Sequence, residues 1–511
     1  MTTTAPPMSH RQLMTVFAGL MIGVLLAALD GTIVSTALPT IAGKLGGLEH
    51  IAWIATAYLL TSTAATPLFG KISDLYGRRP VFQAAIVIFL VGSLLAGLAQ
   101  TFGQLVAFRG IQGIGGGGLQ SIAFVIVGDL VPPRERGRYI GFFTGVFALS
   151  SVVGPLIGGF FVDNLSWRWI FTINLPIGIV ALFVTSWALK IPHVKRDHSI
   201  DWLGAGLLVS ATTSLILTAS WGGKQYSWVS PIILVLAIGG FALVATFVWW
   251  ERRAPEPILP MHLFSNRVFA ASMVALLLVG SLLMSTDSFL PLFMQTVIGA
   301  SATRSGLLLM PLMAGLLITS ISSGRLVART GRYKIFPVIG LGFCCTAVLF
   351  FTRLSTDTGR VYVSAVQFLM GLGIGLTMPT TSVAVQNSVD PKDMGVATAA
   401  AQFCRSFGGA LGLAGYGAVF ASRINGKIPP EVARRVEDPQ TIKSLPPAVR
   451  QNVVSVLANG VRGVYVFALP VMLAAWVIMW FMKELPLRQT AAISHAQAEG
   501  EGHEPLAVVA H

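Results

Sequence analysis

Charged side chains are scarce in this chain: they make up 11% of its 511 residues, against about 25% in an ordinary soluble domain. Histidine and lysine are absent from the long apolar runs, and all eight histidines fall in loops or near the ends of the chain. The three cysteines, Cys344, Cys345 and Cys404, all lie in apolar segments, so no disulfide framework is expected. These absences argue against a soluble protein and against a membrane enzyme built on intramembrane histidine.

Nucleotide-binding signals are also missing. No G-x-x-x-x-G-K-[ST] sequence occurs, so the chain offers no phosphate-binding loop for ATP. Gly113–Gly118 satisfies G-x-G-x-x-G, but it lies inside an apolar run, where its glycines are expected to let helices approach closely. The net charge of +14 is spread over short loops, so it does not indicate nucleic-acid binding. We therefore expect no nucleotide, nucleic acid, metal or cofactor.

Long hydrophobic runs are abundant, and the mean hydropathy of the chain is +0.73. A span needs roughly 20 residues to cross the bilayer core. Fourteen such runs occur, centred near residues 26, 61, 90, 118, 150, 178, 209, 239, 283, 316, 343, 374, 408 and 471. Basic residues gather in the loops on the side of the N-terminus, which predicts that both termini are cytoplasmic.

Two loops in different halves of the chain match each other. The loop after span 2 reads GKISDLYGRRP, and the loop after span 10 reads GRLVARTGRYK. Three positions coincide, since Gly70, Gly77 and Arg78 align with Gly324, Gly331 and Arg332, whereas Ala328 takes the place of Asp74. Such an internal repeat is expected of transporter folds.

The first of these loops resembles the motif between spans 2 and 3 of the major facilitator superfamily. RGIQGIGGGG (Arg109–Gly118) resembles the span 4 motif of that superfamily, and GPLIGG (Gly154–Gly159) resembles the span 5 motif of its exporters. WRWIFTINLPIG (Trp167–Gly178) and LDGTIVSTALP (Leu29–Pro39) are similar to segments of the fourteen-span drug:proton antiporters of the EmrB/QacA type. The resemblance covers residues 14 to 484, approximately.

The resemblance implies an all-α polytopic membrane protein with two six-helix bundles and two inserted spans. It places the N-terminal bundle at 1–190, the inserted pair with its linkers at 191–262 and the C-terminal bundle at 263–487. We also expect an external helical hairpin at about 422–459 and a disordered cytoplasmic tail at 488–511. The expected location is the bacterial cytoplasmic (inner) membrane, with membrane lipids around a chain that functions as a monomer.

Two motifs have conformational roles by this resemblance. A latch that holds the outward-facing state is formed by Gly70, Asp74, Gly77, Arg78 and Arg79 with Asp129. The alternative is an ordinary solvated basic turn. The span 5 motif, which comprises Gly154, Pro155, Gly158 and Gly159, predicts a kinkable and closely packed helix. In the exporters that it resembles, this motif seals the two halves together during access switching.

Only carboxylates can carry a proton deep in the spans, because neither histidine nor lysine is found there. The candidates are Asp30 in span 1 and Asp287 in span 9, with Asp129 more peripheral. An intramembrane aspartate costs roughly 2.5 to 3.5 kcal/mol on insertion scales, so it needs a polar partner or a wet cavity. We expect Asp30 to face a cavity with Arg109 as its partner, and Asp287 to lie at a similar depth in a repeat-related helix. The alternative for Asp30 is a buried aspartate that only pairs helices, and the alternative for Asp287 is a residue that lines a water-filled vestibule.

Further polar residues form stripes at spacings of three and four. They are Arg109 and Gln112 on span 4, Gln367 on span 12, and Gln402 with Arg405 on span 13. Such stripes face a bundle interior or a wet cavity, so we expect Gln112, Gln367, Gln402 and Arg405 to line a substrate cavity together with Asp30 and Asp287. Arg109 is expected to take part in proton coupling with the two aspartates. Helix pairing is again the alternative.

The sequence therefore predicts a proton-coupled antiporter that exports amphipathic, often cationic drugs or dyes from the cytoplasm by alternating access. The proton gradient is the expected energy source, and the expected partners are the small-molecule substrate and protons. The alternative is an exporter of the same fold that carries a lipid, a siderophore or another endogenous metabolite.

Overall fold

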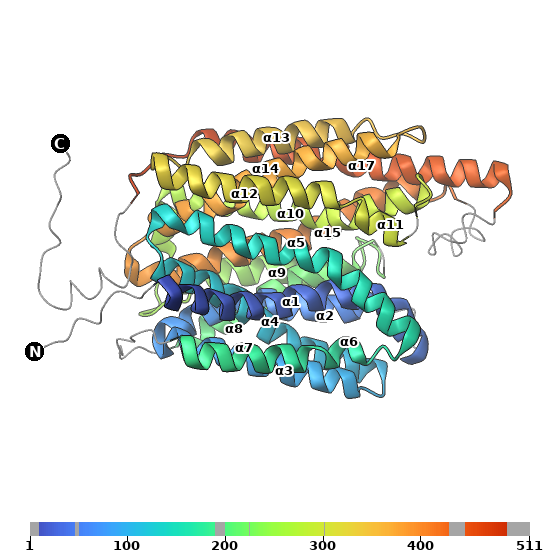
Figure 1. The fold of residues 1–511 in the computed structure, drawn as a ribbon. Coiled ribbons are helices and arrows are strands. Elements are labelled where there is room, and N and C mark those ends of the chain that lie inside the picture. The colour runs from blue at the N-terminus through green and yellow to red at the C-terminus, as the bar shows by residue number, and fades with distance from the viewer. Residues whose placement is uncertain are drawn as a thin grey trace, which may run out of the picture. The chain divides into compact units, whose positions relative to one another are not determined.

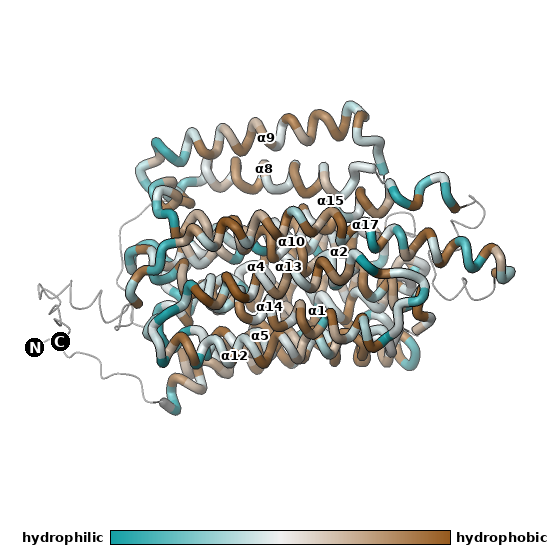
Figure 2. Tube along the Cα trace, turned by 90° about the horizontal axis from the view of Figure 1, so that it is seen from above, coloured by the Kyte–Doolittle hydropathy of each residue, from teal (hydrophilic) through white to brown (hydrophobic). Residues whose placement is uncertain are grey.

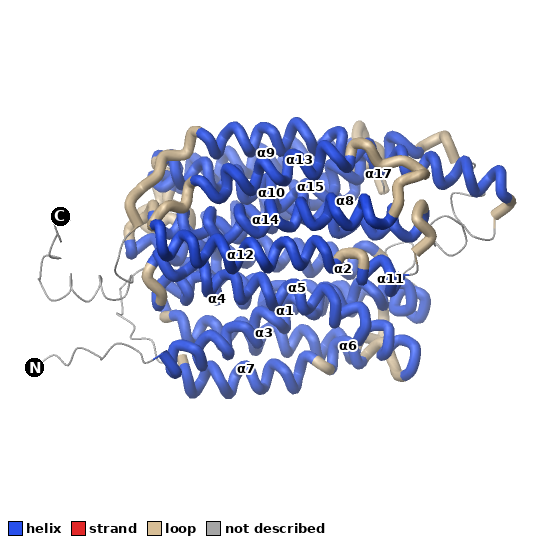
Figure 3. Tube along the Cα trace, turned by 45° about the horizontal axis from the view of Figure 1, so that its top comes forward, coloured by secondary structure: helices blue, strands red, loops and turns tan. Residues whose placement is uncertain are grey.

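The computed structural model describes residues 10–45, 51–189, 200–223, 225–300, 302–428 and 445–487. Within these ranges the regular structure is helical (Figure 3), and the one β contact is an isolated bridge between Gly222 and Tyr226. The predicted all-α class is confirmed.

Figure 1 shows the helices in their order along the chain. In the first half they are α1 (His10–Leu45), α2 (Ala52–Tyr76), α3 (Arg78–Leu98), α4 (Phe102–Leu130), α5 (Pro133–Asn164), α6 (Trp169–Thr172) and α7 (Asn174–Ala188). The next are α8 (Trp202–Trp221), α9 (Pro231–Glu251), α10 (Arg267–Thr296), α11 (Ala302–Leu307) and α12 (Met310–Thr330). The last are α13 (Ile335–Phe351), α14 (Arg360–Asn387), α15 (Met394–Ile424) and α17 (Pro447–Trp480).

Among the described residues, eleven helical segments are long and apolar enough to cross a membrane. The chain is therefore a multi-pass membrane protein. The predicted count of fourteen spans stays a prediction, because α13 has only 17 residues and α2 and α15 are too polar to qualify. Figure 2 shows the hydrophilic residues collected near the helix ends, whereas α9 exposes Val235, Ile238 and Phe241 along its length. An apolar outer surface of this kind suits lipid contact.

The chain forms two compact units. Unit 1 comprises Met1–Ile126 and Leu149–Ile200, and unit 2 comprises Val127–Ala148 and Asp201–His511. In unit 1, α7 packs against α1 and α3; in unit 2, α10 packs along α15 and α12 along α14. The predicted division at residues 190 and 262 stays a prediction, and the predicted tail at 488–511 lies outside the described residues.

The predicted external hairpin stays a prediction, because the structure describes only its two ends. Helix α15 continues to Ile424 and α17 begins at Pro447, so a long helix extends into each end of this segment. Val453 and Leu457 of α17 pack against Phe420 of α15, which supplies the apolar contact that holds the extensions together. Residues 429–444 of the predicted hairpin lie outside the described part of the chain.

Candidate functional site

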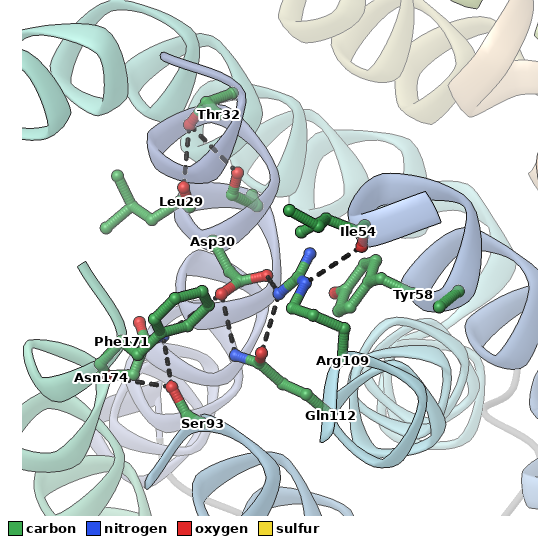
Figure 4. A network of polar contacts seen from close by, with 12 residues as sticks. Leu29, Asp30, Thr32, Ile54, Tyr58, Ser93, Arg109, Gln112, Phe171 and Asn174 are labelled. Carbon is green, nitrogen blue, oxygen red and sulfur yellow. Dashed lines mark hydrogen bonds and ion pairs between the residues drawn. The ribbon is translucent and has the colours of Figure 1, made fainter. Parts of the chain in front are cut away.

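A buried ion pair lies at the centre of unit 1. Asp30 of α1 and Arg109 of α4 have 0% and 1% of their surfaces exposed. Arg109 donates from Nη1 to Asp30 Oδ2 over 2.5 Å (Figure 4). A charge at this depth is tolerated only with a partner, and losing one member of a buried pair costs about 3–5 kcal/mol. The pairing predicted from the sequence is therefore confirmed.

Gln112, one turn after Arg109 on α4, bridges both members of the pair. Its Oε1 accepts a hydrogen bond from Arg109 Nη1 at 2.7 Å, and its Nε2 donates to Asp30 Oδ1 at 2.8 Å. The spacing of three residues puts both side chains on one face of the helix. Gln112 is fully buried, so its amide is held by this network alone. The carboxylate of Asp30, which we expected to face a cavity, is thus enclosed by hydrogen-bond donors.

Two further residues complete the donor set. Asn174, at the start of α7, donates from Nδ2 to Asp30 Oδ1 at 3.4 Å and to Ser93 Oγ at 2.9 Å. Ser93 of α3 in turn donates to the carbonyl oxygen of Phe171 at 2.8 Å. The network thus links α1, α3, α4, α6 and α7, and it can transmit a change at Asp30 to most of unit 1.

Aromatic and backbone groups hold the Arg109 guanidinium from the other side. Its Cζ lies 4.4 Å from the ring centroid of Tyr58 of α2, and its Nε donates to the carbonyl oxygen of Ile54 at 3.4 Å. A cation over an aromatic face gains electrostatic stabilisation that grows with desolvation. Tyr58, Ser93 and Asn174 were not singled out from the sequence. Asn174 is an amide in an otherwise apolar segment, and this feature of the sequence could have indicated that it has a polar partner.

Asp287 lies in a different environment. Its side chain on α10 is exposed, and it makes no hydrogen bond or ion pair with another described residue. The preceding residue, Thr286, is fully buried. Because successive residues of a helix point about 100° apart, Asp287 points away from the packed interior of unit 2. The predicted similarity of its depth to that of Asp30 stays a prediction.

The other predicted cavity residues also belong to unit 2. Gln367 on α14 is fully buried, and Gln402 on α15 is 7% exposed. Arg405, on the same helix as Gln402, is half-buried, with its Cζ 5.7 Å from the ring centroid of Phe147 of α5. Their role in substrate binding stays a prediction.

Five of the predicted latch residues lie at or just before the sharp connection between α2 and α3, whereas the sixth, Asp129, lies near the end of α4 and belongs to unit 2. Gly77 joins the two helices with φ 90°, a conformation that favours glycine, and its repeat partner Gly331 also has a positive φ of 70°. Arg78 pairs with Asp74 at 2.5 Å and donates to Ser73 Oγ at 2.7 Å. Arg79, by contrast, makes no hydrogen bond or ion pair with another described residue.

Arg78→Ala is expected to slow conformational switching several-fold and to leave substrate affinity largely intact. The substitution removes the bonds that Arg78 makes to Asp74 and Ser73. Turnover and binding measured on the same purified protein check this, with Arg79→Ala as the matched control that loses a charge but no described bond. An equal loss of affinity and turnover in Arg78→Ala would contradict a latch role.

The glycines of the span 5 motif have different neighbours in the structure. A Cβ at Gly158 would collide with Thr36 Oγ1 and would lie 2.9 Å from the carbonyl oxygen of Ile33, so this glycine lets α5 approach α1 within unit 1. Gly154 is similarly placed against Thr32, next to Pro155 in the helix. A Cβ at Gly159 would meet no atom within 4 Å, so the fourth member of the motif takes no part in this contact.

The glycines of α4 pack helix to helix, as predicted. A Cβ at Gly113 would lie 2.5 Å from the carbonyl oxygen of Tyr58 of α2. A Cβ at Gly115 would lie 2.7 Å from the carbonyl oxygen of Ala85 of α3. Without side chains at these positions, α4 can lie between α2 and α3 closely enough for Arg109 and Gln112 to reach Asp30.

Residues 20–413 match the sequence profile of the Major Facilitator Superfamily. The chain therefore belongs to this superfamily and is a multi-pass membrane transporter. It is 36% identical over 511 residues to Multidrug resistance protein 3 of Bacillus subtilis, covering 96% of this chain and 99% of that protein. It is 37% identical over 448 residues to the Acurin A biosynthesis cluster MFS-type transporter of Aspergillus aculeatus, and the match covers 86% of this chain and 80% of that protein.

Solved structures show the same fold. The crystal structure of the human organic anion transporter MFSD10 (TETRAN) matches with a TM-score of 0.63 and 16% identity, covering 91% of this chain and 99% of that chain. At that identity the likeness concerns the fold alone.

Proposed function

We propose that this transporter is a proton-coupled antiporter that exports amphipathic, often cationic compounds from the cytoplasm by alternating access. The observation that carries the proposal is the enclosed ion pair between Asp30 and Arg109, both of which are buried within spans of unit 1. The name of the B. subtilis relative supports the drug-like substrate class. As part of this proposal, the transporter is of the fourteen-span EmrB/QacA type, both of its termini lie in the cytoplasm, and it functions as a monomer.

The chemistry follows from the hydrogen bonds of Asp30. As a carboxylate it accepts bonds from Arg109, Gln112 and Asn174. Protonation removes the negative charge and places a donor where the network already has donors, so the ion pair weakens and the helices that it joins are released. Loss of the proton on the other side restores the pair. Each charge moved across 100 mV supplies about 2.3 kcal/mol, which suffices for concentrative export without nucleotide.

Asp287 is suited to recognising the charge of a cationic substrate. Its carboxylate is exposed and makes no bond to another described residue, so a cation can pair with it without first breaking an internal contact. In this division of roles, Asp30 carries the proton and Asp287 contacts the substrate.

A second candidate function keeps the fold and exports an endogenous metabolite or lipid. It is favoured by the relative whose name places it in a biosynthesis cluster. Purified transporter in liposomes with an imposed pH gradient separates the two candidates. Uptake of a cationic dye that exceeds that of neutral lipids and metabolites supports the drug exporter, whereas the reverse order supports the second candidate. Transport of any of them that ignores the gradient argues against proton coupling.

A further inference from the structure

The helices α2 and α4 of unit 1 meet in a defined register. Gly113 of α4 lies against the carbonyl oxygen of Tyr58, and Gly117 lies against that of Ser62. Tyr58 precedes Gly70, the first residue of the repeated loop, by twelve positions.

The helices α12 and α14 of unit 2 meet in the same register. Gly371 of α14 lies against the carbonyl oxygen of Leu312, and Gly375 lies against that of Leu316. Leu312 precedes Gly324, the repeat partner of Gly70, by the same twelve positions. The backbone contacts therefore align Gly113 with Gly371, independently of any side-chain similarity.

This register identifies the unit 2 counterparts of the buried pair. Arg109 lies four residues before Gly113, and Gln367 lies four residues before Gly371, so Gln367 takes the position of Arg109. The next counterparts are three residues further along each helix, where Met370 takes the position of Gln112.

The counterpart of Asp30 follows from the contact that it makes. Asp30 bonds to Gln112, and Thr286 of α10 bonds to Met370, with its Oγ1 3.4 Å from Met370 Sδ. The position of Asp30 is therefore taken by Thr286 and not by the neighbouring Asp287.

The unit 2 centre is buried but uncharged. Thr286 and Gln367 are both fully buried. Neither the amide nitrogen nor the amide oxygen of Gln367 has a hydrogen-bond partner among the described residues. Buried amides are almost always paired, either with protein or with ordered water. Threonine and glutamine offer hydrogen bonds but have no proton to exchange in the physiological range.

We propose that unit 2 contains a second polar site, centred on Gln367 and Thr286, whose unpartnered amide binds a neutral hydrogen-bonding ligand such as an ordered water molecule. It is the uncharged counterpart of the Asp30 centre. Of the two repeat-related centres, only the one in unit 1 can then bind a proton. This last consequence rests on the proposed function, whereas the equivalence of the two centres does not.

The test transfers the ion pair from unit 1 to unit 2 in the full-length protein. Thr286→Asp and Gln367→Arg are each expected to lower the thermal unfolding midpoint by several degrees, because each buries an unpaired charge. The double variant is expected to recover at least half of the summed loss. If a single variant is recovered too poorly to melt, the yield of monodisperse protein provides the same comparison.

The matched control combines Thr286→Asp with Thr381→Arg. Thr381 is also buried on α14, but it lies fourteen residues beyond Gln367, about 21 Å along the helix. No recovery is expected in this control. Losses that simply add in the Thr286→Asp, Gln367→Arg protein would overturn the equivalence. Unfolding is measured without a pH gradient, so the result does not depend on proton coupling.

A second measurement tests whether the unit 2 centre takes part in proton coupling. Gln367→Leu keeps the approximate size of the side chain and removes its hydrogen bonds. Efflux by this variant is expected to retain its dependence on the pH gradient, whatever its rate. A loss of that dependence, with Asp30 intact, would show that the unit 2 centre does take part in proton coupling.

Discussion

Asp30→Asn is expected to reduce gradient-driven efflux at least tenfold while the protein remains folded in the membrane. Asparagine keeps the shape of the side chain and can still accept a bond from Arg109. It cannot gain or lose a proton. Arg109 also retains its bonds to Gln112 and to the carbonyl oxygen of Ile54, and the Tyr58 ring still covers it. Efflux from energised inverted vesicles, normalised to the amount of folded protein, is the measurement.

Asp287→Asn is the matched control, because it makes the same chemical change on an exposed aspartate. We expect it to impair cationic substrates more than neutral ones and to leave the dependence on the gradient in place. Full gradient-dependent efflux by Asp30→Asn would make Asp30 a packing residue, and Asp287 would become the first alternative proton carrier.

Gly158→Leu is expected to reduce transport at least tenfold by forcing α5 away from α1. No leucine rotamer avoids the collision, because the Cβ itself meets Thr36 Oγ1 and the carbonyl oxygen of Ile33. Overpacking a tight contact costs about 1–3 kcal/mol, and more where backbone must move. The protein should still insert, since leucine favours the bilayer. Dye efflux and the yield of folded protein are measured together.

Gly159→Leu provides the control one residue further along α5. Its Cβ would meet no atom within 4 Å, so near-normal transport is expected although the same residue has been added to the same motif. Equal losses in the two variants would show that helix propensity or lipid contact, and not the approach to α1, explains the glycines. Normal efflux by Gly158→Leu would show that the contact has no role.

The ion pair between Asp30 and Arg109 could be predicted because a charged side chain inside a membrane span needs a charged or polar partner. Asp30 and Arg109 are each too costly to leave unpaired in an apolar span, so their association follows from electrostatics before any geometry is known. Asn174 and Ser93 were not predictable in the same way. Small neutral polar groups can hydrogen-bond within their own helix, so their presence in a span does not require a distant partner.

For Asp287, the number of residues that separate it from other charged residues is not enough to predict the environment of its side chain. Its distance from Arg267 predicts a depth in the span similar to that of Asp30, but this distance does not predict which face of α10 the side chain lies on. The face of the helix depends on packing against α14 and α15, and a shift of one residue rotates the side chain by about 100°. The glycine contacts supplied the register that the spacing of charges could not.

If proton binding at Asp30 drives export, then substrate movement through the transporter must also move protons, and this proton movement can be measured. Purified transporter is reconstituted in liposomes that contain a pH indicator, with no imposed gradient, and a transported cationic dye is added to one side. Dye entry is expected to drive protons out of the wild-type liposomes, in the opposite direction to the dye, and no such proton movement is expected with Asp30→Asn. Dye transport without proton movement in the wild type, or undiminished proton movement in Asp30→Asn, would contradict proton coupling at Asp30.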